Sequence, residues 1–490
     1  MSFVDGGQQM QTGQQAVAAK PPLLNLRIVG HAIDASPLTG PIIGVIIIAA
    51  LASLFDAGDA YLLGFAMPGI AKEFNLTSES LGLIGFSTLV GMCVGSFFWG
   101  WIADKWGRKI AFTVTILMYS LFSGVSGLAM GLGFLLGARF LTGIGIGGSV
   151  PVDASILAEF APARIRGYSN GALPITWPMA TFIAAALAFV ILPIGGWRVL
   201  FFIGVLPALL VFWVRRKVPE SPRWLINRRR DDETRSALHY LHISDAAIER
   251  SRVAVQHEAP PPVLPPAVFR DLFTPEMRIR TIHTWILWVL PLMASWGMNF
   301  WIPQLLVKMH GVPLQTAVRY MLYISLFAIA GRLLVYFLSE KVGRKLFIIL
   351  GFSGAGIVLF GEIWTSTANE FFWVAAIYTF FMEAGLCGST IYLPEVYPLH
   401  IRVLGASTAM GLGRIGGAIG SYAIGMFFGA GLMTVMWIFL GAGSLIAGLA
   451  TIWLGIETKG QNLEQLNKEG VEGADKARRR RRTGVPALAT

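Results

Sequence analysis

Residues 40–68 read GPIIGVIIIAALASLFDAGDAYLLGFAMP, an almost continuous apolar run. A run of this length crosses the roughly 30 Å hydrocarbon core of a bilayer as one helix. Its only charged residues are Asp56 and Asp59. Each charge costs roughly 2.5–3.5 kcal/mol at the centre of a membrane helix on insertion scales. Residues three apart share one helix face, so the run predicts a membrane span with a functional acidic face.

The composition extends this interpretation to the whole chain. Of its 490 residues, 54% are hydrophobic and 14% are charged, whereas soluble chains average about 25% charged residues. Cys93 and Cys387 stand far apart in apolar runs and predict no disulfide framework. The polar first 38 residues lack the pattern of a cleaved signal peptide. We therefore expect a multi-pass membrane protein.

Apolar runs of roughly 18–28 residues recur twelve times, and each is long enough to span a bilayer. In the first part of the chain they fall near 41–67, 81–103, 110–131, 133–158, 168–192 and 197–214. In the second part they fall near 281–307, 314–339, 345–366, 371–393, 404–428 and 431–455. The pattern predicts an all-α membrane protein with twelve transmembrane helices.

Lysine and arginine are concentrated in alternate loops, for example DKWGRK, PARIRG and EKVGRK. Because such loops stay on the cytosolic side, both termini are expected in the cytosol. The expected divisions are a polar cytosolic tail (1–40), a first six-helix half (41–214), a cytosolic linker with short helices (215–280), a second six-helix half (281–455) and a basic cytosolic tail (456–490). The run Arg478–Arg482 favours contact with anionic lipid over nucleic-acid binding.

Two motifs recur at one offset. Asp104 and Glu340 each open a D/E-K-x-G-R-K loop and lie 236 residues apart; Glu159 and Glu395 each open an E-x-x-P-x-x-x-R motif at the same offset. The shared offset indicates two parallel six-helix repeats. Transporters built from such repeats place the solute site near the midplane between the halves.

The acid-and-arginine spacing predicts ion pairs that hold the halves together on the cytosolic side and break when that side opens. The alternative is that these charges only anchor helix ends. The predicted latch residues are Asp104, Arg108, Glu159, Arg166, Glu340, Arg344, Glu395 and Arg402.

Further motifs make a resemblance specific. The segment 141–166 (LTGIGIGGSVPVDASILAEFAPARIR), the linker opening PESPRWL (219–225) and the tail opening ETKGQNLE (457–464) resemble the major facilitator superfamily, in particular its sugar-porter-like branch. The similarity spans almost the whole chain. It implies the major facilitator fold and transport by alternating access.

The chain departs from the sugar-porter pattern in the seventh run, WILWVLPLMASWGMNFWIPQLL. The Gln-Gln pair that this branch uses to hold sugar hydroxyls is absent, and tryptophan and phenylalanine dominate. The D-x-x-D of the first run and GLGRIGG (411–417) look more like relatives that carry organic ions, aromatic acids or nicotinate-like vitamins with protons. An aromatic wall suits a flat solute.

Asp59 and Arg139 lie at matching depths, roughly 12 and 9 Å from the outer ends of their helices at 1.5 Å per residue. A pair between them is therefore expected. In proton-coupled sugar porters, an aspartate of span 1 facing an arginine of span 4 is the protonation site, and Asp59 with Arg139 resembles it. A permanent structural ion pair is the alternative. Asp56 is the expected second acid.

Arg414 lies near the middle of its span, where its planar fork suits a carboxylate. It is expected either to anchor an anionic solute or to pair with Glu383 at similar depth. Arg332 is expected to be structural, near Glu340. Asp153 either lines the cytosolic half of the path or accepts hydrogen bonds near Pro151. Further candidate cavity residues are Trp177, Trp296, Asn299, Phe300 and Tyr392.

These features predict a secondary transporter of the plasma membrane, specifically a bacterial inner membrane, that imports a small organic carboxylate with protons. The expected partners are a small-molecule substrate, protons and the lipid bilayer, without nucleic acid, and the protein is expected to be a monomer. No phosphate-binding GxxxxGK loop, metal-ligand spacing or nucleophile set occurs, so we expect no enzyme, cofactor or metal. A sugar or polyol porter, a proton-antiport exporter and a receptor-like sensor remain alternatives.

Overall fold

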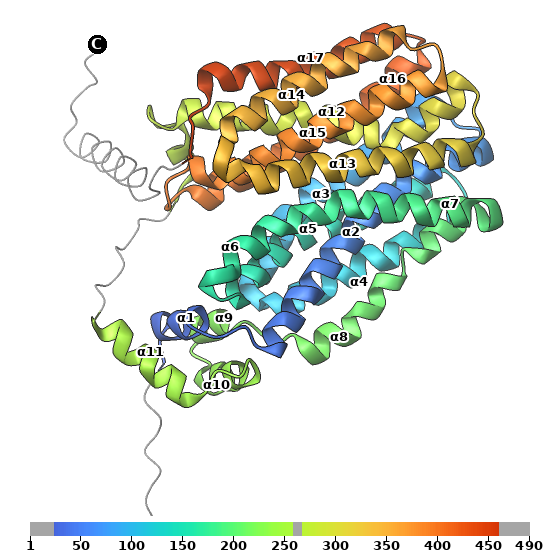
Figure 1. Ribbon diagram of the computed structural model, residues 1–490. Coiled ribbons are helices and arrows are strands. Elements are labelled where there is room, and N and C mark those ends of the chain that lie inside the picture. Colours follow the sequence, from blue (N-terminus) through green and yellow to red (C-terminus); the bar gives the residue numbers. More distant parts are fainter. Residues whose placement is uncertain (1–23, 258–266, 460–490) are drawn as a thin grey trace, which may run out of the picture.

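The computed structural model describes residues 24–257 and 267–459, and every regular element in these ranges is helical (Figure 1). Long helices run side by side in one bundle, and short helices lie at one end of it. The prediction of an all-α chain is therefore confirmed.

The helices of the first part enclose Asp56 and Asp59. They are α1 (Leu26–Asp34), α2 (Gly40–Phe74), α3 (Ser78–Trp106), α4 (Arg108–Gly127), α5 (Leu132–Phe160), α6 (Ala163–Ala172), η1 (Leu173–Ile175), α7 (Thr176–Ile203), η2 (Leu206–Leu209), α8 (Leu210–Lys217), α9 (Pro222–Asn227), α10 (Asp231–Tyr240) and α11 (Asp245–His257). We call α2–α8 the N-terminal half.

The helices of the second part begin after the break at 258–266. They are η3 (Phe269–Phe273), α12 (Arg278–His310), α13 (Leu314–Val342), α14 (Arg344–Phe360), η4 (Gly361–Trp364), α15 (Ala368–Val396), α16 (Arg402–Gly429) and α17 (Met433–Leu454). We call α12–α17 the C-terminal half.

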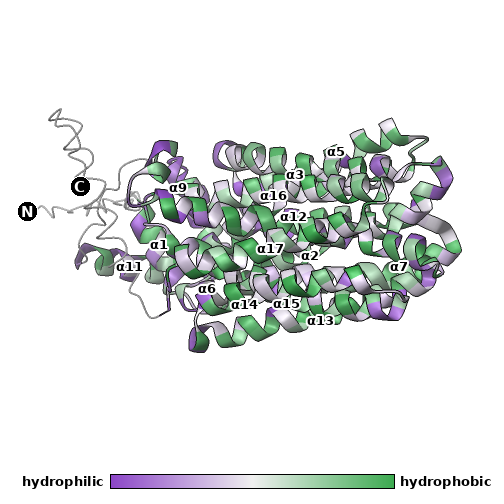
Figure 2. Ribbon diagram, turned by 90° about the horizontal axis from the view of Figure 1, so that it is seen from above, coloured by the Kyte–Doolittle hydropathy of each residue, from purple (hydrophilic) through white to green (hydrophobic). Residues whose placement is uncertain are grey.

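Within the described ranges, ten helical segments are long and apolar enough to cross a membrane. Two predicted spans are not among them. The first is α16, whose eight glycines and Arg414 lower its hydropathy. The second is the region near 197–214, which is divided among the end of α7, η2 and α8. Figure 2 shows hydrophilic residues gathered at the two ends of the bundle and apolar residues between them.

The predicted boundary between the fifth and sixth runs coincides with a kink in the structure. The label α7 covers two helices that meet at Gly196, whose φ of 67° and ψ of −169° are not helical. A residue other than glycine is strained at such a positive φ. The chain therefore turns within a few residues rather than through a separate loop.

Short helices cover the end of the bundle where α4 and α14 begin, which we call the basic side because Arg108 and Arg344 lie there. Helices α1, α9, α10 and α11 lie beyond the bundle at this end (Figure 1). The N-terminal tail was not predicted to contain a helix, but α1 buries Ile28, Val29 and Ile33. The predicted tail run Arg478–Arg482 lies outside the described residues.

Glycines bring α3 and α5 into backbone contact. A Cβ added at Gly147 of α5 would lie 2.0 Å from the Met92 carbonyl oxygen, and one at Gly95 of α3 would lie 2.1 Å from the Ile144 carbonyl oxygen. Membrane helices pack closely through such small residues. This close packing fixes the depth of Ser149 and Asp153 relative to α3.

The two halves also meet through glycines, and these contacts lie away from the basic side. A Cβ at Gly64 of α2 would lie 2.7 Å from the Asn299 carbonyl oxygen, and one at Gly425 of α16 would lie 2.5 Å from the Ser78 carbonyl oxygen. Ser78 begins α3 at the end opposite Trp106. The halves are therefore tightly packed at the end of the bundle opposite the basic side.

Substituting Gly147→Ala should lower the melting temperature of the purified protein, because the new methyl group has no space beside Met92. Overpacking typically costs about 1–3 kcal/mol. Gly137→Ala on the same helix is the matched control, since nothing lies within 4 Å of a Cβ there. Equal melting temperatures for the two variants would contradict the packing described for α3 and α5.

Candidate functional site

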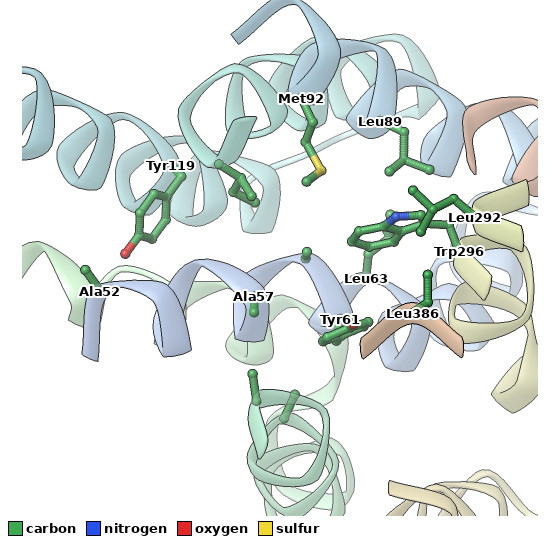
Figure 3. Packing of buried hydrophobic residues seen from close by; sticks show 14 of the residues in the cluster. Ala52, Ala57, Tyr61, Leu63, Leu89, Met92, Tyr119, Leu292, Trp296 and Leu386 are labelled. Carbon is green, nitrogen blue, oxygen red and sulfur yellow. The ribbon is translucent and has the colours of Figure 1, made fainter. Parts of the chain in front are cut away.

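A cavity of about 140 Å³ lies between the two halves. In Figure 3, Tyr61, Met92, Leu292, Trp296 and Leu386 surround the same space. Both halves contribute to its lining, which consists of Ser53, Tyr61, Met92, Val150, Leu173, Pro174, Trp177, Trp288, Leu292, Ser295, Trp296, Arg332, Glu383, Leu386, Thr390, Met410 and Arg414. An engineered cavity of about 150 Å³ in another protein holds one benzene molecule, so this space is suited to one small ring.

The wall of the cavity is aromatic. Tyr61 and Trp296 are stacked, with ring centroids 5.7 Å apart and planes inclined by 22°. Trp177 meets Trp296 edge-on at 5.7 Å. The indole Nε1 of Trp288 is buried without a hydrogen-bond partner. The cavity thus offers flat apolar faces, which suit a planar solute.

Arg332 and Glu383 form an ion pair in the cavity wall. Arg332 Nε lies 2.5 Å from Glu383 Oε2, and Arg332 Nη1 donates to the Pro174 carbonyl at 2.5 Å. Pro178 has no N–H, so the Pro174 carbonyl lacks its usual partner four residues later in the helix. Arg332 therefore donates to a carbonyl of the other half that Pro178 deprives of its helical donor.

This ion pair corrects two predictions. Arg332 lines the cavity instead of lying near Glu340, and it takes the Glu383 partner proposed as an alternative for Arg414. The sequence offered a signal for the pair, since both residues are charged and lie inside apolar runs. Their depths alone did not show which arginine faces Glu383.

Arg414 reaches the opposite half by a different contact. Its Nη1 donates to the hydroxyl of Ser96 on α3. Ser96 can in turn donate to the Gly147 carbonyl at 3.1 Å or to the Met92 carbonyl at 2.7 Å. Pro151 deprives the Gly147 carbonyl of its helical N–H donor. Arg414 is thus held by a neutral hydroxyl, and no carboxylate among the described residues is in hydrogen-bond contact with it.

Asp59 and Arg139 come together in the N-terminal half. Arg139 Nη1 lies 3.3 Å from Asp59 Oδ2, and the side chains are 0% and 1% exposed. Ser123 donates to the other carboxylate oxygen. The Arg139 guanidinium also lies over the Phe201 ring, 5.1 Å from its centroid. The structure thus contains the pair that matching depths led us to expect.

Asp56 lies on the same helix face but has a different partner, the hydroxyl of Ser149 on α5. Its second oxygen, Oδ1, is buried without a partner. Both oxygens of Asp153 are also buried without partners. No hydrogen bond from the backbone near Pro151 reaches Asp153, so the structure does not support that reading of its role.

Three predicted cavity residues lie outside the lining. Asn299 donates from Nδ2 to the Ser295 carbonyl of its own helix at 2.8 Å. Phe300 packs behind Trp296, with ring centroids 5.4 Å apart. The Tyr392 hydroxyl accepts from the Ile456 backbone N–H at 3.0 Å and so faces the end of the chain. Periodicity placed these residues at cavity depth but could not fix the rotation of each helix.

The predicted latch residues form two equivalent clusters at the basic side. Arg108 Nη1 lies 2.6 Å from Asp104 and its Nε 3.0 Å from Glu159. The second cluster repeats this arrangement: Arg344 Nη2 lies 2.6 Å from Glu340 and 3.1 Å from Glu395.

Each cluster joins helices of one half, which corrects the expectation that these pairs tie the halves together. Arg166 and Arg402 also lie outside the two clusters. Arg166 binds Asp34 of α1 and the Ala161 carbonyl, and Arg402 donates to the Tyr397 carbonyl. The structure thus shows two local staples in place of a cross-half latch.

Two glutamates that the sequence analysis did not single out complete these clusters. Glu220 accepts from the Arg108 backbone N–H at 2.8 Å, and Glu457 accepts from the Arg344 backbone N–H at 3.1 Å. They belong to the PESP and ETKG motifs, which were the available signal. Burial raises the pKa of Glu220, and the backbone N–H groups of Ser221, Lys109 and Arg108 offset part of that rise.

Within residues 24–257 and 267–459, no group of three or more His, Cys, Asp or Glu residues could hold a metal ion. What the two halves enclose is an aromatic cavity with two arginines beside it, and a set of buried acids lies in the N-terminal half. A helical membrane bundle with such a cavity has the architecture of a membrane transporter.

The chain belongs to the Major Facilitator Superfamily, whose family model matches residues 49–421. It is similar to the niacin transporter NiaP of Acinetobacter baylyi, with 32% identity over 84% of this chain and 93% of that protein. It is also similar to the benzoate transport protein of the same organism, with 26% identity over 81% of this chain and 86% of that protein. The protein is accordingly a transporter and not an enzyme.

Solved structures support the same fold. The xylose transporter XylE from E. coli, in a partially occluded inward-open conformation, matches with a TM-score of 0.69 and 18% identity. The match covers 86% of this chain and 100% of that one. At this level of identity it shows the fold alone.

Glu383→Leu should lower the melting temperature strongly, because it leaves the buried Arg332 charge without its carboxylate. Breaking a buried pair in this way costs about 3–5 kcal/mol. Adding Arg332→Leu should restore part of the loss, since the double variant leaves no unpaired charge. Additive losses in the double variant, measured by thermal unfolding, would contradict a direct pair.

Proposed function

We propose that this protein is a proton-coupled symporter that imports a small aromatic or vitamin-like carboxylate across the plasma membrane, a bacterial inner membrane. The observation that carries the proposal is the 140 Å³ aromatic cavity beside Arg414, whose guanidinium has a neutral partner. A carboxylate is a stronger acceptor than a hydroxyl for such a group. A carboxylate solute can therefore displace Ser96 from Arg414.

The topology proposed with this function has twelve spans in two six-helix halves and both termini in the cytosol. The divisions remain 1–40, 41–214, 215–280, 281–455 and 456–490. The described chain begins beside α1 and ends beside the Arg344 cluster, both at the basic side, which favours an even number of spans. The proposed partners are the solute, protons and lipid, and the protein is proposed to act as a monomer without nucleic acid.

The substrate class draws support from relatives and from the cavity together. The similar proteins named niacin and benzoate transporters carry small ring acids by their names. The lining of the cavity includes flat aromatic faces and the Arg414 residue. Nicotinate and benzoate each combine one planar ring with one carboxylate, so both complement these groups.

Asp59 is the proposed proton carrier, opposite Arg139. Desolvation favours the neutral acid and the arginine favours the carboxylate, so a motion that changes either contribution changes proton affinity. The halves are proposed to rock about the cavity, while the two Arg108 and Arg344 staples keep each half rigid. The tight glycine contacts away from the basic side are then the contacts that open when the solute enters.

A sugar or polyol porter is the second candidate, favoured by the likeness to XylE in fold. The lining of the cavity contains no glutamine, the residue type with which the sugar-porter-like branch holds sugar hydroxyls. Proton-antiport export of drugs or metabolites uses the same parts in the reverse direction, and a direct flux assay separates it from import.

Arg414→Ala should weaken nicotinate binding by roughly 10- to 100-fold, because a hydrogen bond to a charged group contributes about 1.5–3 kcal/mol. Binding is measured by calorimetry on the purified protein. Arg250→Ala, on the exposed face of α11, is the matched control for removal of one arginine. Undiminished nicotinate affinity in Arg414→Ala would exclude Arg414 as the anchor.

Asp59→Asn should abolish uphill nicotinate uptake into proteoliposomes with an imposed pH gradient, because the amide cannot carry the proton. Exchange of labelled nicotinate between loaded compartments should persist. Asp232→Asn on exposed α10 should leave both activities unchanged. Proton-driven accumulation at the normal rate in Asp59→Asn would contradict the assignment.

A further inference from the structure

We propose that Asp153 and Asp56 form a second proton site, in which Asp153 holds a proton and passes it to Asp56. This proposal rests on the proposed proton coupling and adds a step to it. The site lies in the N-terminal half on α2 and α5, between the Asp59–Arg139 pair and the basic side. Neither the cavity nor the Arg108 cluster contains Asp153.

Helix geometry places the two carboxylates beside each other. Ser149 and Asp153 are four residues apart on α5 and so share one face. Ser149 donates to the Asp56 carboxylate of α2. Asp153 lies one helical turn nearer the basic side on this same face, and its charge acts directly on that of Asp56. The protonation of one of these two acids therefore affects the proton affinity of the other.

Unpartnered oxygens converge on this site. Asp153, Asp56 and Tyr119 are each 0% exposed. Both oxygens of Asp153, the Oδ1 of Asp56 and the Tyr119 hydroxyl have no hydrogen-bond partner. Figure 3 shows the Tyr119 hydroxyl pointing toward α2, near Ala52. Asp56 follows Ala52 by about one helical turn. The three carboxylate oxygens only accept when both acids are ionised, and the single Tyr119 hydroxyl can donate to only one of them. A proton on one of the acids supplies the missing donor.

The charges around the site leave Asp153 without a cation. Asp59 on α2 is occupied by Arg139 of α5. Arg414 of α16 acts on Asp56 and on Cys93 of α3. The charged group that acts on Asp153 is Asp56, itself an acid. An ionised carboxylate buried without a donor or cation costs several kcal/mol, so the neutral acid is the stable form of Asp153.

The transfer step follows from this arrangement. The O–H bond of Asp153 breaks and an O–H bond forms on Asp56, so the negative charge moves from Asp56 to Asp153 and no other atom is exchanged. Arg414 stabilises ionised Asp56 while the cavity is empty. When a solute carboxylate neutralises Arg414, Asp56 loses that support and becomes the stronger base. Solute binding thereby draws the proton toward the cavity.

Infrared difference spectroscopy on the purified full-length protein in lipid at pH 7 tests the protonation state without any solute. A neutral carboxyl group and a carboxylate have separate C=O stretching bands, and only the neutral band shifts on exchange into D₂O. Asp153→Asn should remove one neutral-carboxyl band. The control Asp232→Asn, exposed on α10, should remove carboxylate intensity only. Loss of carboxylate intensity in Asp153→Asn would overturn the proposal.

Two further variants and one ion substitution complete the test. If Asp153→Asn does not fold, Asp153→Glu retains the group and must show a displaced neutral band; an unchanged spectrum would overturn the proposal. Asp56→Asn must keep the Asp153 band and shift it. Replacing potassium by sodium ions should leave the band intact, and its loss would assign a cation site instead of a proton site. Because no solute is used, failure of nicotinate transport has no bearing on these results.

Discussion

The contact between the two halves beside the cavity depends on hydrogen bonds from two C-terminal arginines to N-terminal helices, next to carbonyls that proline deprives of a helical N–H donor. Pro178 removes that donor from the Pro174 carbonyl, to which Arg332 donates. Pro151 frees the Gly147 carbonyl, which Ser96 can satisfy while it accepts from Arg414. Unsatisfied backbone groups are costly within a membrane. At Pro174 the donor comes directly from the other half, and at Gly147 it is Ser96 of the same half, which in turn binds Arg414 of the other half.

Arg332 and Arg414 have different side-chain partners, and we infer different roles for them from that difference. Arg332 also has the Glu383 carboxylate, so its charge is balanced inside the wall. Arg414 has a serine hydroxyl, and its charge extends to Asp56. One arginine thus fixes the wall of the cavity. The other links the cavity to the buried acids, which is the physical basis for coupling a carboxylate solute to proton movement.

Sequence reasoning found those parts of the site that depend on depth and spacing. The matching depths of Asp59 and Arg139 predicted their ion pair. The repeated motifs predicted that Arg108 and Arg344 bind nearby acids. Helix rotation and cross-half contacts were beyond its reach. Arg332 was therefore assigned to the wrong neighbour, and Tyr392 was assigned to the cavity although it binds the Ile456 backbone. That the Arg108 and Arg344 clusters each join helices of one half depends on tertiary packing, which the sequence motifs did not reveal.

The most direct test of the central claim is calorimetric titration of the purified wild-type protein with nicotinate, nicotinamide and xylose under one set of conditions. Nicotinate and nicotinamide share a ring and differ in charge, so their comparison isolates the carboxylate. Saturable binding of nicotinate, with binding of nicotinamide and xylose at least tenfold weaker, is the expected result. Equal binding of the amide, or binding of xylose alone, would contradict recognition of a carboxylate by Arg414.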